Sequence, residues 1–374
     1  MVLPAFPVFG IDIIGFSFNL LTFFSIYLAI SISLNLELGY AGIPNFGKAL
    51  LVAAGGSIGG SFAGQFSAWA LGVNTQGNFM AHWYTIIPQV SVLLAGNVPL
   101  SLLVVALSVL VGAFAGAAFG YLASFPALRL REDYLAMILL AMAQLYVLFL
   151  SNTNFITDTT DGLAVPDVFR FAGDLDPVLA TLTIVVFAGG VYLYAERVAR
   201  SPLGRMLRAA RDNEAASEAL GKDVVRARRN VLVVASAISG AAGALWAFQA
   251  GITQPGEYSR FVWTIYPWVM VIMGGAANNV GVAVGTMLFW FLLKFVDVTK
   301  FSFSGYIPFE INYLQYMTVG AVLILILYFR PQGILKEKST ATLPKEWIRE
   351  SVRKMLGEER SGNGGPGPPR AADG

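Results

Sequence analysis

Nine long apolar runs limit how this chain can fold more than any other feature of the sequence. Most are long enough to cross ~30 Å of hydrocarbon as a helix that rises ~1.5 Å per residue. They lie near residues 14–36, 41–63, 99–125, 134–151, 178–195, 230–252, 262–274, 280–297 and 313–329. Charged residues make up only 13% of the chain, whereas soluble domains carry ~25%. The sequence therefore predicts an all-α, polytopic transmembrane helical bundle of about nine segments, with eight or ten as alternatives.

The main source of that range is the short run 262–274. Together with 280–297 it forms either two spans or a re-entrant pair, and the sequence leaves both open.

Basic residues are concentrated in alternate loops. The loop 196–229 contains nine arginines and lysines, 64–98 contains none, and 152–177 contains one arginine against five aspartates. Because loops rich in Lys and Arg stay in the cytoplasm, we expect the N-terminus outside and the C-terminus in the cytoplasm. We predict a transmembrane domain over 1–335 and a cytoplasmic tail over 336–374, disordered from about 361, where Gly and Pro dominate.

A cluster of helix-breaking residues follows the first run. A helix broken at membrane depth can line a polar pathway, although a plain cytoplasmic turn would have the same composition. The candidate pathway residues are Gly39, Tyr40, Gly42, Pro44, Asn45 and Gly47.

Few charges fall within the runs. An intramembrane charge is a functional candidate. Lys48, Lys294 and Asp297 each lie near a predicted interface, however, so we expect their side chains to extend to water instead. With no series of acidic residues across the membrane, a proton-coupled carrier is disfavoured. The Gly residues at 55–64 and 112–120 have the small-xxx-small spacing of closely packed membrane helices.

The segment 201–221 predicts two short helices on the cytoplasmic side. Ser201 and Pro202 suit the start of the first, Asp212 or Asn213 can cap the second, and Gly221 can end it. A small apolar face on such a pair can enter a groove on another protein; the alternative is a solvated loop that only marks topology. The candidate docking residues are Arg211, Asn213, Glu214, Ala215, Ala216, Ala219, Leu220 and Gly221.

Five motifs in order resemble the branched-chain amino acid ABC transporter permeases, the Liv-type membrane subunits. They are Leu-Asn-Leu-Glu-Leu-Gly-Tyr-Ala-Gly at 34–42, Leu-Arg-Leu-Arg-Glu-Asp-Tyr-Leu-Ala at 128–136, the loop 201–221, the glycines 274, 275 and 281, and Phe-Arg-Pro-Gln-Gly at 329–333. Two departures are Lys48, where the family usually has His, and Ala277, which replaces a Gly.

The resemblance implies a multi-pass permease subunit in a prokaryotic cell membrane that does no covalent chemistry. It also implies a second permease subunit, expected to form a heterodimer, two cytoplasmic ABC ATPases and an extracytoplasmic solute-binding protein. In that family 201–221 would be the ATPase-coupling loop. The expected solute is a branched-chain or other aliphatic amino acid, with urea or a short amide as the alternative.

The remaining expectations come from residue types. The sequence has no Cys, a single His and no P-loop motif, so we expect no metal site, no catalytic residue and no cofactor on this chain, with ATP and Mg²⁺ on partner subunits. Nothing suggests a nucleic-acid partner. A secondary transporter without an ATPase, and a membrane enzyme using the acidic 152–177 loop, are the rivals from other classes.

Overall fold

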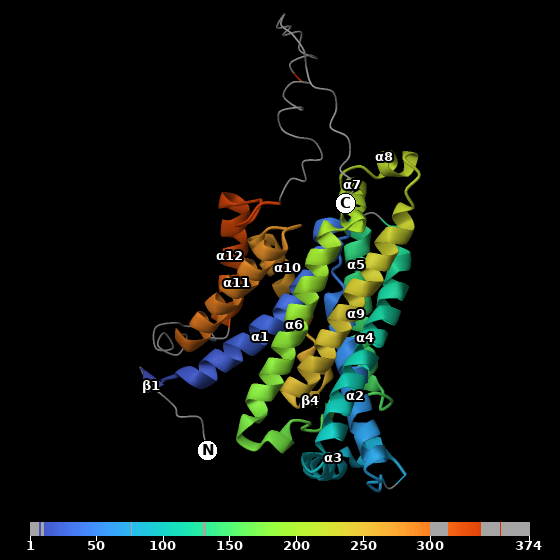
Figure 1. Cartoon of the computed structure of the whole chain (residues 1–374), viewed down its shortest axis with the longest axis vertical. Coiled ribbons are helices and arrows are strands. Elements are labelled where there is room, and N and C mark those ends of the chain that lie inside the picture. The colour runs from blue at the N-terminus through green and yellow to red at the C-terminus, as the bar shows by residue number, and fades with distance from the viewer. Residues whose placement is uncertain are drawn as a thin grey trace, which may run out of the picture. The chain divides into compact units, whose positions relative to one another are not determined.

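The computed structural model (Figure 1) describes residues 7–8, 11–75, 77–128, 130, 132–299, 313–337 and 352. The chain divides into Met1–Glu337 and Lys338–Gly374, and all elements below belong to the first unit. The tail predicted to be disordered from 361 lies outside the described residues, as do Arg129 and Arg131.

Within the described residues, seven helices are long and apolar enough to cross a membrane. They are α1 (Ile13–Leu34) with the π-helix η1 (Asn35–Tyr40), α2 (Lys48–Ala70), α4 (Val98–Ala127), α5 (Glu132–Asn152), α6 (Asp176–Arg200), α9 (Val224–Ala250) and α11 (Asn279–Thr299). Two shorter helical segments occupy the other two predicted runs: η4 (Phe261–Ile265) with α10 (Tyr266–Gly274), and α12 (Tyr313–Phe329). The predicted all-α polytopic bundle is confirmed.

The remaining elements are shorter than the membrane-length helices. They are α3 (Phe79–Ala95), η2 (Arg170–Leu175), α7 (Pro202–Asp212), α8 (Glu214–Ala219), η3 (Pro255–Glu257) and two antiparallel strand pairs, β1 (Pro7–Val8) with β2 (Ile11–Asp12) and β3 (Leu163–Ala164) with β4 (Ile252–Thr253). Figure 1 shows α7 and α8 at one end and α3 at the other. We call these the α7 end and the α3 end.

Two predicted boundaries were wrong. The run 41–63 was read as one span, but 41–47 contains no helix and α2 runs on to Ala70. The stretch 64–98 was read as an outer loop, but most of it is helical, because α3 packs its apolar residues against α2 and α4.

Glycines bring α2, α4 and α9 into backbone contact at the centre of the bundle. A Cβ at Gly55 or Gly116 would overlap the backbone of α9 near Gly240, and a Cβ at Gly240 would overlap α4. The predicted close packing of small residues is confirmed. These three helices make the most extensive helix–helix packing of the described bundle.

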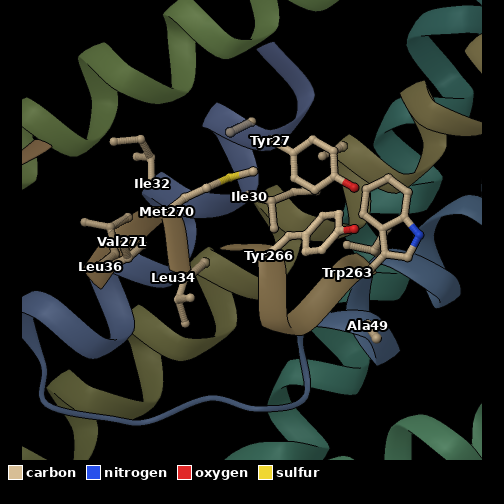
Figure 2. Close-up of a cluster of buried hydrophobic side chains, with 14 of the residues drawn as sticks. Tyr27, Ile30, Ile32, Leu34, Leu36, Ala49, Trp263, Tyr266, Met270 and Val271 are labelled. Carbon is tan, nitrogen blue, oxygen red and sulfur yellow. The ribbon is translucent and has the colours of Figure 1, made fainter. Parts of the chain in front are cut away.

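Aromatic rings fill the space between α1 and the segment η4–α10. Tyr27 stacks on Trp263 with ring centroids 5.4 Å apart, and Figure 2 shows both rings beside Tyr266. Tyr27 and Trp263 are almost fully buried, so η4 is held firmly against α1.

The short helix α10 and the long helix α11 form a hairpin. Its turn is tight because a Cβ at Gly274 would overlap the backbone of Gly281. The segment after α12 closes over this turn: Ile334 N donates to Met273 O (2.9 Å) and Leu335 N donates to Gly274 O (3.1 Å). Residues 262–297 therefore form a helical hairpin with one short arm, because the 14 residues of η4–α10 rise only about 21 Å. The choice between two spans and a re-entrant pair stays a prediction.

Candidate functional site

The first membrane helix ends in an irregular segment that re-enters the bundle. The α1 helix widens into the π-helix η1, and residues 41–47 then have no helical structure before α2 begins. Gly42 has φ 69°, a conformation that favours glycine. A non-helical 41–47 fits both a broken helix that lines a pathway and a plain turn, so the role of these residues stays a prediction.

A buried ion pair lies across this break. The Nζ of Lys48 is 2.9 Å from Oε2 of Glu37, and both side chains are fully buried. Lys48 also donates hydrogen bonds to the hydroxyls of Ser33 (3.0 Å) and Ser239 (3.2 Å). The expectation that Lys48 extends to water was wrong, because 41–47 carries the chain back into the bundle before α2 starts.

The sequence analysis did not identify Glu37 as a charge within the span. The break was placed directly after the apolar run, so Glu37 was counted as a loop residue. One signal was available: Leu36 and Leu38 continue the apolar pattern on both sides of it, and a lysine follows across the break. An acidic residue in such a position is a functional candidate.

Lys294 and Asp297 lie close together near the end of α11. Their charged atoms are 3.8 Å apart, and both side chains are partly exposed. The amine of Lys294 also lies over the rings of Phe23 and Trp290.

A series of hydrogen bonds joins η1 to the turn between α10 and α11. The Asn35 side chain donates to Asn279 Oδ1 (2.9 Å) and accepts from Ala277 N (2.8 Å), and Asn279 donates to Glu196 Oε2 (3.0 Å). Gly39 lies against the same atoms, and any Cβ there would overlap Asn35 Oδ1. Ala277 adopts φ 62°, which explains why glycine suits that position.

The loop 201–221 folds as the sequence predicts. Ser201 Oγ accepts from Gly204 N (3.3 Å) at the start of α7, and Asn213 Oδ1 accepts from Ala216 N (3.0 Å) at the start of α8. Gly221 follows α8 with φ 73°. The predicted pair of short capped helices is confirmed.

The α8 helix leaves its small apolar side chains uncovered. Exposed side chains here are Ala215, Ala216, Ala219 and Leu220, and Leu220 is 79% exposed. By contrast, Leu207 and Ala210 of α7 are buried. The α7 helix therefore anchors the pair to the bundle, while α8 projects.

Two arginines attach the α7–α8 pair to the broken helix. Arg211 donates to the carbonyl of Gly39 and to Glu337 Oε2 (2.9 Å). Arg228 donates to Ala41 O (3.2 Å) and to Glu214 Oε2 (2.7 Å). Partial burial alone would lower the pKa of Arg211, but the hydrogen bonds and charges of Glu337 and Asp212 outweigh it and raise the pKa.

The predicted site residues thus fall into two connected groups. Gly39, Tyr40 and Gly42 lie beside α7, where Arg208 stacks over the Tyr40 ring and Arg211 packs on Gly42. Asn45 and Gly47 are buried: Asn45 O accepts from Trp268 Nε1 (3.1 Å), and Asn45 Oδ1 accepts from Gly47 N (2.8 Å). Pro44 is between the two groups in the chain. Sequence reasoning missed Arg228, because its partners are far away in the sequence.

Metal ligands are scarce in the part of the chain that the structure describes. No group of three or more His, Asp or Glu side chains there is placed to hold an ion.

A bundle of membrane-length helices, a broken span with a buried ion pair and a projecting capped helix pair define a multi-pass membrane transport protein. The family model described as "Branched-chain amino acid transport system / permease component" matches residues 16–327. The chain therefore belongs to the branched-chain amino acid transport permease family, and it is a multi-pass protein of the prokaryotic cell membrane. This confirms the resemblance drawn from the sequence motifs.

Individual relatives agree with the family match. The "Probable branched-chain amino acid transport permease protein LivM" of Methanocaldococcus jannaschii is 33% identical over 352 residues, which cover 93% of this chain and all of the relative. The "High-affinity branched-chain amino acid transport system permease protein LivM" of Salmonella typhimurium and that of Escherichia coli are each 27% identical over 247 residues, or 59% of this chain and 54% of theirs. No solved structure is significantly similar to the chain.

Proposed function

We propose that this chain is one of two permease subunits of an ATP-driven importer of branched-chain or other aliphatic amino acids. ATP and Mg²⁺ bind two cytoplasmic ATPase subunits, and an extracytoplasmic binding protein delivers the solute. The second permease subunit is a different chain. In this arrangement the α7 end faces the cytoplasm, because the Arg-rich loop 196–229 is there.

One observation carries this proposal: α8 is an exposed helix whose support is tied directly to the broken span. Arg211 and Arg228 connect α7, α8 and α9 to the backbone of Gly39 and Ala41. A push on α8 by an ATPase therefore acts on the segment that carries Glu37 and leads to Lys48. This linkage favours coupled transport over a loop that only marks topology.

A secondary transporter is the alternative, because Glu37 is an intramembrane carboxylate that could couple transport to an ion gradient. Its charge is compensated by Lys48 at 2.9 Å and is sealed from solvent, whereas a coupling carboxylate must exchange ions with water. Uptake into vesicles that follows ATP and persists when ion gradients are collapsed would support the ATP-driven importer. Uptake that follows an ion gradient without ATP would contradict it.

The docking role of α8 is tested by Ala216→Glu. A bulky charge on the exposed face would overfill a tight groove, at ~1–3 kcal/mol, and would bury an unpaired charge. A total of ~3 kcal/mol weakens docking about a hundredfold. We expect loss of ATPase co-purification and of ATP-driven uptake, with normal membrane insertion.

The matched control is Ala81→Glu, the same change at an exposed residue of α3, at the opposite end of the bundle. It should leave ATPase binding intact. If Ala216→Glu inserts, binds the ATPase normally and transports at the unaltered rate, then 201–221 is not the coupling loop.

A further inference from the structure

A cavity of about 490 Å³ opens on the side of the bundle between α5 and the segment that joins β4 to η4. Its polar lining residues are Gln144, Ser259 and Arg260, all exposed, and its apolar lining includes Leu140, Val147 and Ile265. The volume is within the ~300–1,000 Å³ of small-molecule sites, which combine an apolar wall with a few polar groups.

The cavity lies at membrane depth. Its lining residue Tyr258 packs on Gly56 of α2. On α5, Tyr146 between Gln144 and Val147 exchanges a hydrogen bond with Ser57 (2.8 Å). At ~1.5 Å per residue, Gly56 and Ser57 are about 12 Å from the start of α2 and about 20 Å from its end. The cavity is therefore level with the interior of a span.

Arg260 is unusual at this depth. It makes no hydrogen bond or ion pair with any residue that the structure describes, and its side chain is exposed. A charged group facing hydrocarbon there is costly, so an exposed arginine at this depth indicates contact with water, a solute or another polar group. The backbone of 251–259 is also largely non-helical, and irregular backbone at membrane depth is tolerated where it lines a cavity.

We propose that this cavity is the solute site of the permease and that it takes an α-amino acid with an uncharged aliphatic side chain. The Arg260 guanidinium binds the solute carboxylate, with hydrogen bonds from the Ser259 hydroxyl and the Gln144 amide. The aliphatic side chain packs against Leu140, Val147 and Ile265. The inference rests on the proposed import function and makes it more specific.

The charge of the lining selects among the solutes that the sequence left open. Among the described residues that line the cavity, Arg260 is the only charged one, and none is Asp or Glu. A solute with a carboxylate gains a charge-assisted, two-pronged contact with Arg260. Urea and short amides have no carboxylate, so they leave the guanidinium unpaired.

The test measures equilibrium binding of radiolabelled leucine to the whole transporter in nanodiscs without the binding protein. Leucinol, which lacks the carboxylate, is the competitor. Arg260→Gln should weaken leucine binding by at least ~10-fold, because a hydrogen bond to a charged group contributes ~1.5–3 kcal/mol. Arg260→Lys should recover part of the affinity, and Gln144→Leu should lose less than Arg260→Gln.

The matched control is Arg197→Gln on exposed α6, away from the cavity; it should bind leucine normally. Excess leucinol should displace little radiolabelled leucine from the unaltered protein. In Arg260→Gln, leucinol should compete about as well as unlabelled leucine. Unchanged leucine affinity in Arg260→Gln overturns the proposal. So does loss of the second permease subunit from purified Arg260→Gln, because Arg260 would then be an interface residue.

ATP-driven leucine uptake by the same preparation, with the binding protein added, tests the import function separately from the cavity site. Intact uptake by an unaltered complex that binds no leucine in nanodiscs refutes the cavity site and leaves the import function standing. Absence of ATP-driven uptake of any amino acid contradicts the import function itself, and the site with it.

Discussion

Replacing Lys48 with methionine should destabilise the protein strongly, because it leaves the Glu37 carboxylate buried without its partner. At 2.9 Å two unit charges attract by ~6 kcal/mol if the effective dielectric constant is ~20. Desolvation of both groups offsets much of that attraction, so the measurable cost is that of removing one partner from a buried pair, ~3–5 kcal/mol. A loss of this size would exceed most single substitutions.

The informative comparison is with the double variant Glu37→Gln, Lys48→Met. It retains the volume of both side chains but buries no charge, and neutral replacements of buried pairs are often tolerated. We therefore expect the double variant to be at least ~2 kcal/mol more stable than Lys48→Met alone. A double-mutant cycle isolates this coupling.

The assay is denaturant or thermal unfolding of the purified complex in detergent, with Lys294→Met as the control. Lys294 is partly exposed and 3.8 Å from Asp297, so its loss should cost less than ~1 kcal/mol. Equal losses in Lys48→Met and Lys294→Met would refute the reasoning, as would a double variant no more stable than Lys48→Met. Uptake by a stable double variant then shows whether the pair is needed for transport as well as for stability.

Three further predictions concern topology, packing and selectivity. The chain has no cysteine, so Asn213→Cys should resist an impermeant maleimide in intact cells and react in inverted vesicles; labelling in intact cells would reverse the proposed orientation. Gly240→Ala should destabilise the bundle by ~1–3 kcal/mol through overpacking against α4, whereas Gly189→Ala, with open space around it, should not; similar unfolding midpoints for the two would show that the central helices can separate. Uptake should favour leucine over arginine and glutamate, because the membrane helices offer few unpaired charges for a charged side chain; transport of arginine or glutamate with none of leucine would contradict this selectivity.

Much of the site was accessible from local sequence, because caps and glycine conformations depend on neighbouring residues. Ser201, Asn213 and Gly221 set the limits of α7 and α8 through contacts within a few residues. The length and apolarity of the runs likewise determined the bundle, since the bilayer leaves a polar backbone little choice but to form helices. The sequence motifs also pointed to the family without any tertiary information.

The tertiary structure alone decided where charges lie in depth and which distant residues meet. Lys48 looked like an interfacial lysine until the fold of 41–47 placed it beside Glu37 and Ser239. Arg228 meets Ala41 across a separation of 187 residues, and Gln144 and Arg260 line one cavity from different elements. Hydrophobic periodicity reports the environment of each segment but carries no information about which segments pack together, so these pairings arise only when the helices are assembled.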